Sequence, residues 1–209
     1  MKTARQITVI ALVVLTGCFS LGRDEPVQIH YVLGGSGPAA IPAPDSLIDD
    51  LTVALRQLQI AEYLQTPFIV VRREQHMITF SESNRWGERL REGITRTMAA
   101  NLAVRAPFRG VDTVPWPTGA RYDYLIQLHV LLFEGAAPED SLSSDGEARV
   151  TVSWEILGPR DGSVLSRGIT DFREDWTVGE YGVLVALLDT GLGVLADDLV
   201  NAMVDLAAP

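Results

Sequence analysis

The hydrophobic repeat of the chain lengthens from two residues to nearly four close to Thr177, and this change limits the folds that the second half can adopt. Residues 122–133 and 148–157 alternate apolar and polar side chains, and residues 163–172 follow the second segment after a Pro-Arg-Asp-Gly turn. Alternation places every second side chain on one face of a strand. These three segments therefore predict an antiparallel meander with one buried face.

The last helix is predicted to begin at a capping box and to continue to about Leu206. Thr177 and Glu180 have the spacing at which two side chains satisfy each other's backbone amide groups. The apolar stripe of this helix comprises Leu184, Leu188, Leu192, Leu195 and Leu199. The acidic residues expected to face away from the stripe are Asp189, Asp197, Asp198 and Asp205. This pattern favours a helix that lies on a sheet over one that spans a membrane.

The first half of the chain is predicted to contain shorter strands. Strands are expected over residues 27–33 and 68–72, and a further strand over residues 77–80 is expected to close a hairpin. Residues 51–60 fit both a strand repeat and a helix repeat. The strand is preferred because Pro67 closes the unit and another apolar run follows at once.

One helix and two loops complete the expected fold. Apolar side chains at every fourth position, starting at Trp86, predict an amphipathic helix over residues 84–104, with Asn84 as its N-cap. Glycine and proline predict a loop over residues 34–45, and an acidic stretch predicts another over residues 134–146. The expected fold class is a single α/β (α+β) domain, in which two long amphipathic helices pack on a mixed or largely antiparallel β-sheet.

The N-terminus has the order of features found in a secretory signal. Lys2 and Arg5 precede an uncharged apolar run over residues 7–15, and small residues then lead to Cys18, the only cysteine. The Leu-Thr-Gly-Cys ending resembles the bacterial lipobox, in which the cysteine is acylated and the chain is cut before it. The apolar run is also shorter than the roughly 20 residues needed to span a bilayer.

Cys18 is therefore expected to be the lipid-attachment residue of an envelope protein. The expected parts are a cleaved signal peptide over residues 1–17, a lipid-anchored tether over residues 18–26 and a periplasmic α/β domain over residues 27–209. The alternatives are an unlipidated signal peptide or a short membrane anchor in which the cysteine is incidental.

The acidic composition excludes some classes of partner. The chain carries 17 basic and 27 acidic residues, a net charge of −10. Loss of Lys2 and Arg5 with the signal peptide would lower this charge to −12. Such a surface argues against nucleic acid, whose phosphates bind basic faces, and against anionic lipid headgroups bound through charge. A single cysteine also allows no intramolecular disulfide, so the fold must rest on packing.

Residues that could carry catalysis or bind a metal ion are scattered. His30, His76 and His129 are far apart in the sequence and lack the close spacing of a metal-ligand set. The Gly34–Gly37 stretch lacks the lysine of a phosphate-binding loop, and no Gly-x-Ser-x-Gly nucleophile motif occurs. We therefore expect no enzyme activity, no catalytic residues, no metal site and no cofactor.

Three aromatic residues are candidates for an interface with a partner. Trp116 stands between two prolines, and Trp176 and Tyr181 lie in and just after the charged approach to the last helix. Aromatic side chains exposed on loops often anchor protein interfaces. The alternative is that these rings belong to the rim of the core.

Several segments, in a fixed order, carry a resemblance to a known family. They are Tyr31-Val32-Leu33, then Leu58 to Pro67 with Phe68-Ile69-Val70 behind, then Arg85 to Leu90, Ile94 and Asn101-Leu102. With the lipobox and the final helix, these residues make the chain similar to the PqiC-like family, the auxiliary lipoproteins of MCE-associated ABC-type lipid transport. One departure is Ala61, where the family often has a proline before its acidic-Tyr-Leu segment.

The resemblance implies a function in protein assembly. Its expected partners are an MCE-domain protein, an ABC permease and an ATPase, which together move phospholipid or related lipids between membranes and support envelope integrity. The lipoprotein would dock this system at the periplasmic face of the outer membrane, and a homo-oligomer is compatible with the role. Phe19, which follows the cysteine, is not the acidic residue of inner-membrane retention. The alternatives are another outer-membrane assembly or cell-wall regulatory lipoprotein, and a periplasmic hydrolase.

Overall fold

The computed structural model describes residues 27–35, 48, 50–138 and 145–208. The expected signal peptide, Cys18 and most of the predicted 34–45 loop lie outside the described residues. In chain order the elements are β1 (Ile29–Tyr31), β2 (Thr52–Leu55), β3 (Gln59–Ile60), the 3₁₀ turn η1 (Glu62–Leu64), β4 (Phe68–Arg72), β5 (Ile78–Trp86), α2 (Leu90–Arg105), β6 (Gly110–Thr113), β7 (Tyr124–Ala136), β8 (Asp145–Leu157), β9 (Val164–Thr177) and α3 (Tyr181–Ala207).

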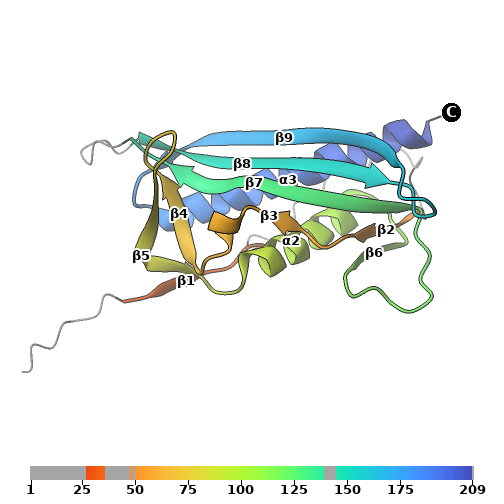
Figure 1. Ribbon diagram of the computed structural model, residues 1–209, viewed down its shortest axis with the longest axis horizontal. Helices are drawn as coiled ribbons and strands as arrows, with labels where there is room; N and C mark the ends of the chain where they lie inside the picture. The colour runs from red at the N-terminus through yellow and green to blue at the C-terminus, as the bar shows by residue number, and fades with distance from the viewer. Residues whose placement is uncertain (1–26, 36–47, 49, 139–144, 209) are drawn as a thin grey trace, which may run out of the picture.

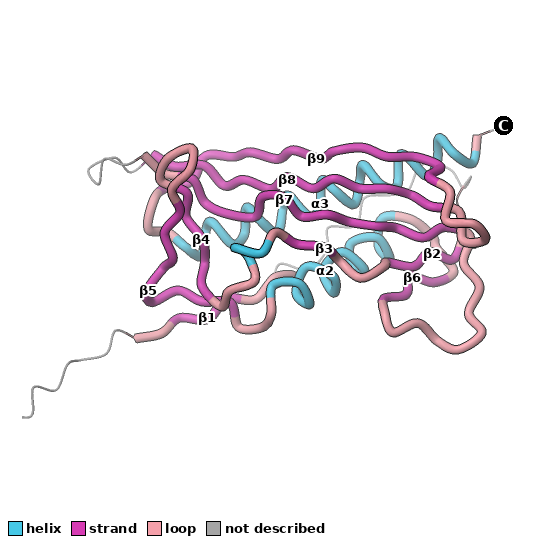
Figure 2. The backbone as a smooth tube through the Cα atoms, in the orientation of Figure 1, coloured by secondary structure: helices cyan, strands magenta, loops and turns pink. Residues whose placement is uncertain are grey.

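The strands form one mixed sheet that is organised around β7 (Figures 1 and 2). On one side of β7 lies the predicted meander, because β8 pairs with β7 and β9 pairs with β8, both antiparallel. On the other side β2, β3 and β4 pair in succession with the start, middle and end of β7, all parallel to it. Outside these short strands, β6 pairs with β2 and β5 pairs with β4, and β1 in turn pairs with β5.

Both helices lie on the same side of the sheet, and Figure 1 shows α3 running behind the meander and α2 below β3. The predicted leucine stripe of α3 is confirmed, since all five leucines are fully buried. At Gly191 the backbone of α3 approaches β8 so closely that a Cβ would lie 2.7 Å from Val150 Cγ2. Ile94, Met98 and Leu102 bury the facing side of α2. The expected α/β fold with two sheet-packed helices is therefore confirmed.

The predicted start of the first helix is wrong by six residues. The segment from Ser81 to Trp86 belongs to β5, and α2 begins at Leu90 with Arg89 as its N-cap. Trp86 stays in the strand because its N–H donates to the Pro67 carbonyl, at 2.8 Å, and because β1 pairs alongside it. These pairings join distant parts of the chain, so the local repeat did not reveal them.

The meander strands are longer than predicted, and the capping box is wrong. β7 continues to Ala136 and β9 to Thr177, and both extend into segments predicted as loop or as the start of a helix. Thr177 is therefore a strand residue, and the N-cap of α3 is Glu180, whose side chain makes no capping hydrogen bond. Gly179, at φ 101°, makes the turn between strand and helix, a backbone angle that favours glycine.

Three of the four acidic residues of α3 hold neighbouring elements, contrary to expectation. Asp189 accepts a hydrogen bond from the Gly34 backbone N–H, and Asp198 accepts one from the Thr170 hydroxyl. Asp197 binds Arg105 of α2, and Asp205 is exposed, as expected. No helix among the described residues is both long and apolar enough to cross a membrane.

Candidate binding groove

The sheet has a gap beside β3. β2 and β4 each have an outer neighbour, β6 and β5 respectively, whereas within the described residues β3 pairs only with β7. The strand-preferring segment over residues 51–60 is thus split into two short strands joined by Arg56, Gln57 and Leu58. No described strand occupies the position beside β3, between β6 and the end of β5.

Backbone hydrogen-bonding groups are left open at this gap. The N–H groups of Arg56 and Ala61 donate to β7 carbonyls, at 2.9 and 3.1 Å. Between them, Leu58 makes no backbone hydrogen bond to another described residue. Because strand groups alternate in direction, the N–H of Ile60 also faces away from β7, toward the gap. The edge therefore presents two amide donors over a short distance.

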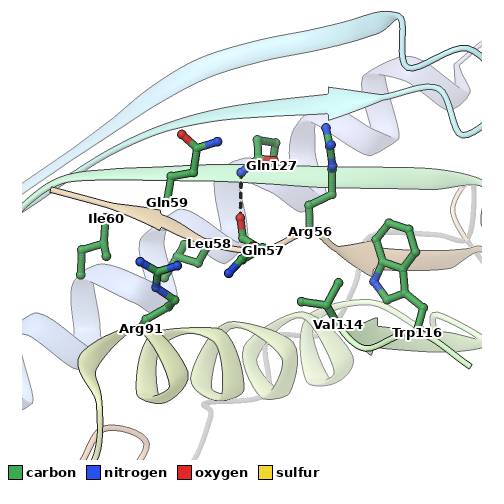
Figure 3. A pocket seen from close by; sticks show the side chains of 9 residues that line it. All are labelled: Arg56, Gln57, Leu58, Gln59, Ile60, Arg91, Val114, Trp116 and Gln127. Carbon is green, nitrogen blue, oxygen red and sulfur yellow. Dashed lines mark hydrogen bonds between the residues drawn. The ribbon is translucent and has the colours of Figure 1, made fainter. Parts of the chain in front are cut away.

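Two adjoining depressions lie along the gap, between the 56–60 segment and the first turns of α2. One has a volume of about 550 Å³ and includes Trp116 and Gln127 in its lining, as shown in Figure 3. The other has a volume of about 690 Å³ and reaches Pro67. Gln57, Ile60 and Arg91 line both depressions, so we treat them as one feature and call it the edge groove.

The edge groove brings together the segments that carried the family resemblance. Leu64 and Pro67, from the first of those segments, line one wall of the second depression. Trp86 and Leu90, from the next segment, also line it, with the Trp86 N–H donating to the Pro67 carbonyl. Ile60, Leu64, Trp86 and Leu90 are all buried, so the floor of this depression is apolar.

Trp116 stands at one end of the edge groove, as Figure 3 shows. Its indole Nε1 donates to the Leu55 carbonyl at 3.2 Å, and its ring meets the ring of Tyr122 edge-on with centroids 5.4 Å apart. The Gln127 side chain donates to the Gln57 carbonyl at 3.1 Å beside it. Half-buried and fixed at the groove mouth, Trp116 remains a candidate interface residue.

Trp176 and Tyr181 do not line the edge groove. Trp176 is only 2% exposed, so the expectation that it is exposed is wrong. Its Nε1 donates to the Glu180 carbonyl at 3.0 Å, and its ring packs edge-on against half-buried Tyr181 with centroids 5.8 Å apart. A Cβ at Gly135 would lie 2.8 Å from the Trp176 ring, so this indole is inserted tightly into the core.

Two arginines give the edge groove a positive rim. Arg56 lies on the segment between β2 and β3, and Figure 3 shows Arg91 reaching from α2 toward that segment. Neither forms an ion pair with a described carboxylate, whereas nearby Arg89 and Arg96 pair with Glu92 and Glu88. Because Glu88 and Glu92 also line the groove but are paired with Arg96 and Arg89, the unpaired positive charge at its rim comes from Arg56 and Arg91.

A buried carboxylate fixes the wall of the edge groove in place. Glu134 of β7 has a fully buried side chain that accepts hydrogen bonds from Arg72 of β4 and from the Tyr63 hydroxyl of η1, the latter at 2.8 Å. Burial, with the hydrogen bond to Glu134, raises the pKa of Tyr63 far above its usual value. The hydrogen bond that Arg72 donates to Glu134 likewise raises the pKa of Arg72. This cluster ties η1 to the sheet, and sequence reasoning missed it because its members are scattered.

The histidines are not gathered into one place. His30 lies in β1, His76 in the turn before β5 and His129 in β7. Among the residues that the structure describes, no three histidine, cysteine, aspartate or glutamate side chains are grouped as a metal site.

Comparisons with known proteins identify both a family and a fold. A family model described as the ABC-type transport auxiliary lipoprotein component matches residues 31–200. A crystal structure of a Xanthomonas campestris protein of the DUF330 family has a TM-score of 0.66 at 14% identity, and the match covers 81% of this chain and 93% of that one. A second crystal structure, of a protein described as uncharacterized, has a TM-score of 0.61 at 16% identity, with 85% and 99% covered.

A more distant match is the PelC dodecamer of Paraburkholderia phytofirmans, with a TM-score of 0.45 at 17% identity, 73% of this chain and 92% of that chain being covered. This similarity is too weak to support an argument. Among curated proteins, none matches the sequence.

Proposed function

Because the chain belongs to the family of ABC-type transport auxiliary lipoprotein components, we propose that it serves such a transport system as a non-catalytic docking subunit in the cell envelope. The match runs from the last residue of β1 to within α3, so it includes β2 to β9 and all the residues that line the edge groove. It confirms the resemblance to auxiliary lipoproteins that the sequence suggested. The match over residues 31–200 is the observation that carries the proposal.

The proposed partners are an MCE-domain protein, an ABC permease and an ATPase, and the proposed cargo is phospholipid or a related lipid moved between membranes. An auxiliary subunit that holds such partners needs surfaces that accept protein segments. The edge groove supports this role, since it combines an open strand edge, an apolar floor and unpaired arginines. By supporting lipid movement, the subunit would contribute to envelope integrity.

The proposed location is the periplasmic face of the outer membrane, with attachment through acylated Cys18. Two or more acyl chains anchor a protein stably, whereas a single chain binds reversibly. The nine residues from Cys18 to Pro26 span at most about 30 Å when fully extended. The folded domain would therefore work close to the bilayer.

Affinity purification from the native host tests this function. The full-length lipoprotein, tagged at its C-terminus and expressed at its normal level, is solubilised with its membranes, and the bound proteins are identified by mass spectrometry. We expect the MCE-domain protein and the ABC subunits to be recovered together. Recovery of outer-membrane assembly factors or cell-wall enzymes, with no transport subunit, would overturn the proposal.

A further inference from the structure

We propose that the edge groove binds an extended, acidic segment of a partner protein, which adds to β3 as an extra strand. The proposal rests on the docking function proposed above and specifies how a partner is held. Three independent features support it: the missing strand, the shape of the groove and the charge of its rim.

The first feature is the unfilled strand position beside β3. A strand placed beside β3 would lie in line between β6, which ends at Thr113, and the end of β5 at Trp86. It would accept hydrogen bonds from the N–H groups of Leu58 and Ile60, which have no partner among the described residues. Unpaired strand edges are the usual template for strand addition by a bound peptide.

The outer edge of the meander differs in this respect. Along β9, Arg173 pairs with Asp171 and also approaches Glu147 of β8, at 3.0 and 3.8 Å. Charged side chains of this kind are a common protection of edge strands against pairing. Around β3, by contrast, the two amides face a groove.

The second feature is the room that the groove provides. Neighbouring strands lie about 4.8 Å apart and rise about 3.3 Å per residue, so a segment of roughly five residues would span the distance from Arg56 to Ala61. Every second side chain of that segment would point toward α2, where Ile60, Leu64 and Leu90 form an apolar floor. An alternating apolar and polar segment therefore fits the groove.

The third feature is the charge at the rim. Arg56 and Arg91 lie on opposite sides of the groove, and neither has a carboxylate partner among the described residues. Guanidinium groups pair well with carboxylates, often through two hydrogen bonds. In a chain with a net charge of −10 this local positive rim selects acidic side chains on the outward face of the bound strand.

The test uses the full-length lipoprotein in detergent and a fluorescent peptide of about eight residues that alternates valine and glutamate, a length that exceeds the span of the groove. We expect saturable binding that Arg56→Glu together with Arg91→Glu weakens about tenfold or more. The matched control is Arg160→Glu, an exposed arginine in the β8–β9 turn, which is expected to leave binding unchanged. A peptide that alternates valine and lysine is expected to bind the double variant and not the native chain.

A backbone measurement separates strand addition from simple charge attraction. Bound acidic peptide is expected to slow hydrogen exchange at the Leu58 and Ile60 amides, and a peptide N-methylated at alternate residues is expected to bind at least about tenfold more weakly. Equal binding of the acidic and basic peptides by the native chain would overturn the proposal. So would unchanged exchange at the two amides, or failure of the acidic peptide to bind.

Crosslinking in cells separates this inference from the proposed function. A photoreactive residue is placed at exposed Gln59, with a control at exposed Leu165 of β9. Crosslinks from Gln59 alone to a transport subunit support both proposals. Recovery of the transport subunits without a Gln59 crosslink overturns the groove and leaves the function standing. A Gln59 crosslink to an acidic segment of an unrelated protein supports the groove and overturns the function.

Discussion

Arg105 of α2 donates through Nε to a carboxylate oxygen of Asp197 of α3, at 2.6 Å, and this pair joins the two helices that cover the sheet. The Arg105 side chain is 7% exposed, and its guanidinium also donates to the Asn101 side chain at 3.0 Å. On α3 a Cβ at Gly193 would lie 2.8 Å from the guanidinium, so the absence of a side chain there makes room for it. The pair places a buried charge where the two helices meet.

Asp197→Ala is expected to lower the free energy of unfolding by about 2 kcal/mol, because it leaves the Arg105 charge buried without its partner. The full penalty of a buried pair is not expected, since Asp197 itself is 36% exposed. Urea denaturation measures the change. Asp205→Ala, at an exposed position of the same helix, is the control and is expected to change stability by less than about 0.5 kcal/mol. Equal effects of the two substitutions would refute the assignment.

Stability at alkaline pH is expected to depend on Tyr63. Burial and the hydrogen bond to Glu134 raise its pKa in the folded state above the value of about 10 in the unfolded chain. The stability that Tyr63 contributes is therefore complete below about pH 10. It is lost as the pH rises further, because the unfolded chain then releases the tyrosine proton while the folded chain keeps it. We expect Tyr63→Phe to reduce the slope of unfolding free energy against pH in this alkaline range, by an amount that corresponds to the release of up to one proton on unfolding. An unchanged slope between pH 9 and 12 would contradict this (about one pH unit below and two above the unfolded pKa).

Gly168→Ala is expected to destabilise the meander by about 2 kcal/mol, as overpacking does in other cores. Gly168 pairs with Trp154 across β8 and β9, and a Cβ at this glycine would lie 2.3 Å from the indole. Gly110→Ala in β6 is the control, because its Cβ would meet only Thr52 at an ordinary 3.6 Å. Thermal unfolding of the two variants checks the contrast. A loss at Gly110 as large as that at Gly168 would argue against the close indole contact.

The two tryptophans proposed from sequence as interface residues are expected to respond differently to truncation. Trp176→Ala removes a buried ring and is expected to lower unfolding free energy by about 4 kcal/mol. Trp116→Phe removes the hydrogen bond to the Leu55 carbonyl and part of a half-buried ring beside Tyr122, and it is expected to lower the unfolding free energy by about 1 kcal/mol. Chemical denaturation measures both values, and a larger loss at Trp116 would reverse the two assignments.

Cys18→Ala is expected to release the protein from membranes while leaving the domain folded, because the described strands and helices begin only at Ile29. Cell fractionation and circular dichroism measure the two properties. The exported soluble variant is also expected to lose function in the cell. Membrane retention of the variant, or full complementation by it, would show that acylation of this cysteine is not the required attachment.

The sequence predicts an element well where a local repeat determines it. The leucine stripe of α3 and the alternation of β8 depend on neighbouring residues, and both are confirmed. β6 was missed, because its four residues form a strand only through parallel pairing with β2. The same limit explains β5, whose last residues are held by β1 and by Pro67.

The candidate site was partly visible in the sequence. Trp116 was singled out, and it stands at the edge groove. The groove itself could not be predicted, because Arg56 and Arg91 come to line one depression only once the 56–60 segment and α2 are placed in space. Trp176 was misjudged because its charged sequence neighbours suggested exposure. In the sheet the three charged residues before it, Arg173, Glu174 and Asp175, are all exposed, while the Trp176 indole is buried in the core.

The dependence of β2, β3 and β4 on one long strand has a consequence for the order in which the fold can be assembled. Residues 124–207 hold the meander and α3, whose contacts join segments close in sequence, and such contacts form fastest. Until β7 is present, β2 and β4 each lack one of their two pairing strands, and β3 lacks the only one that the structure describes. During synthesis and export from the N-terminus, the half of the chain that emerges first must therefore wait for the half that emerges last.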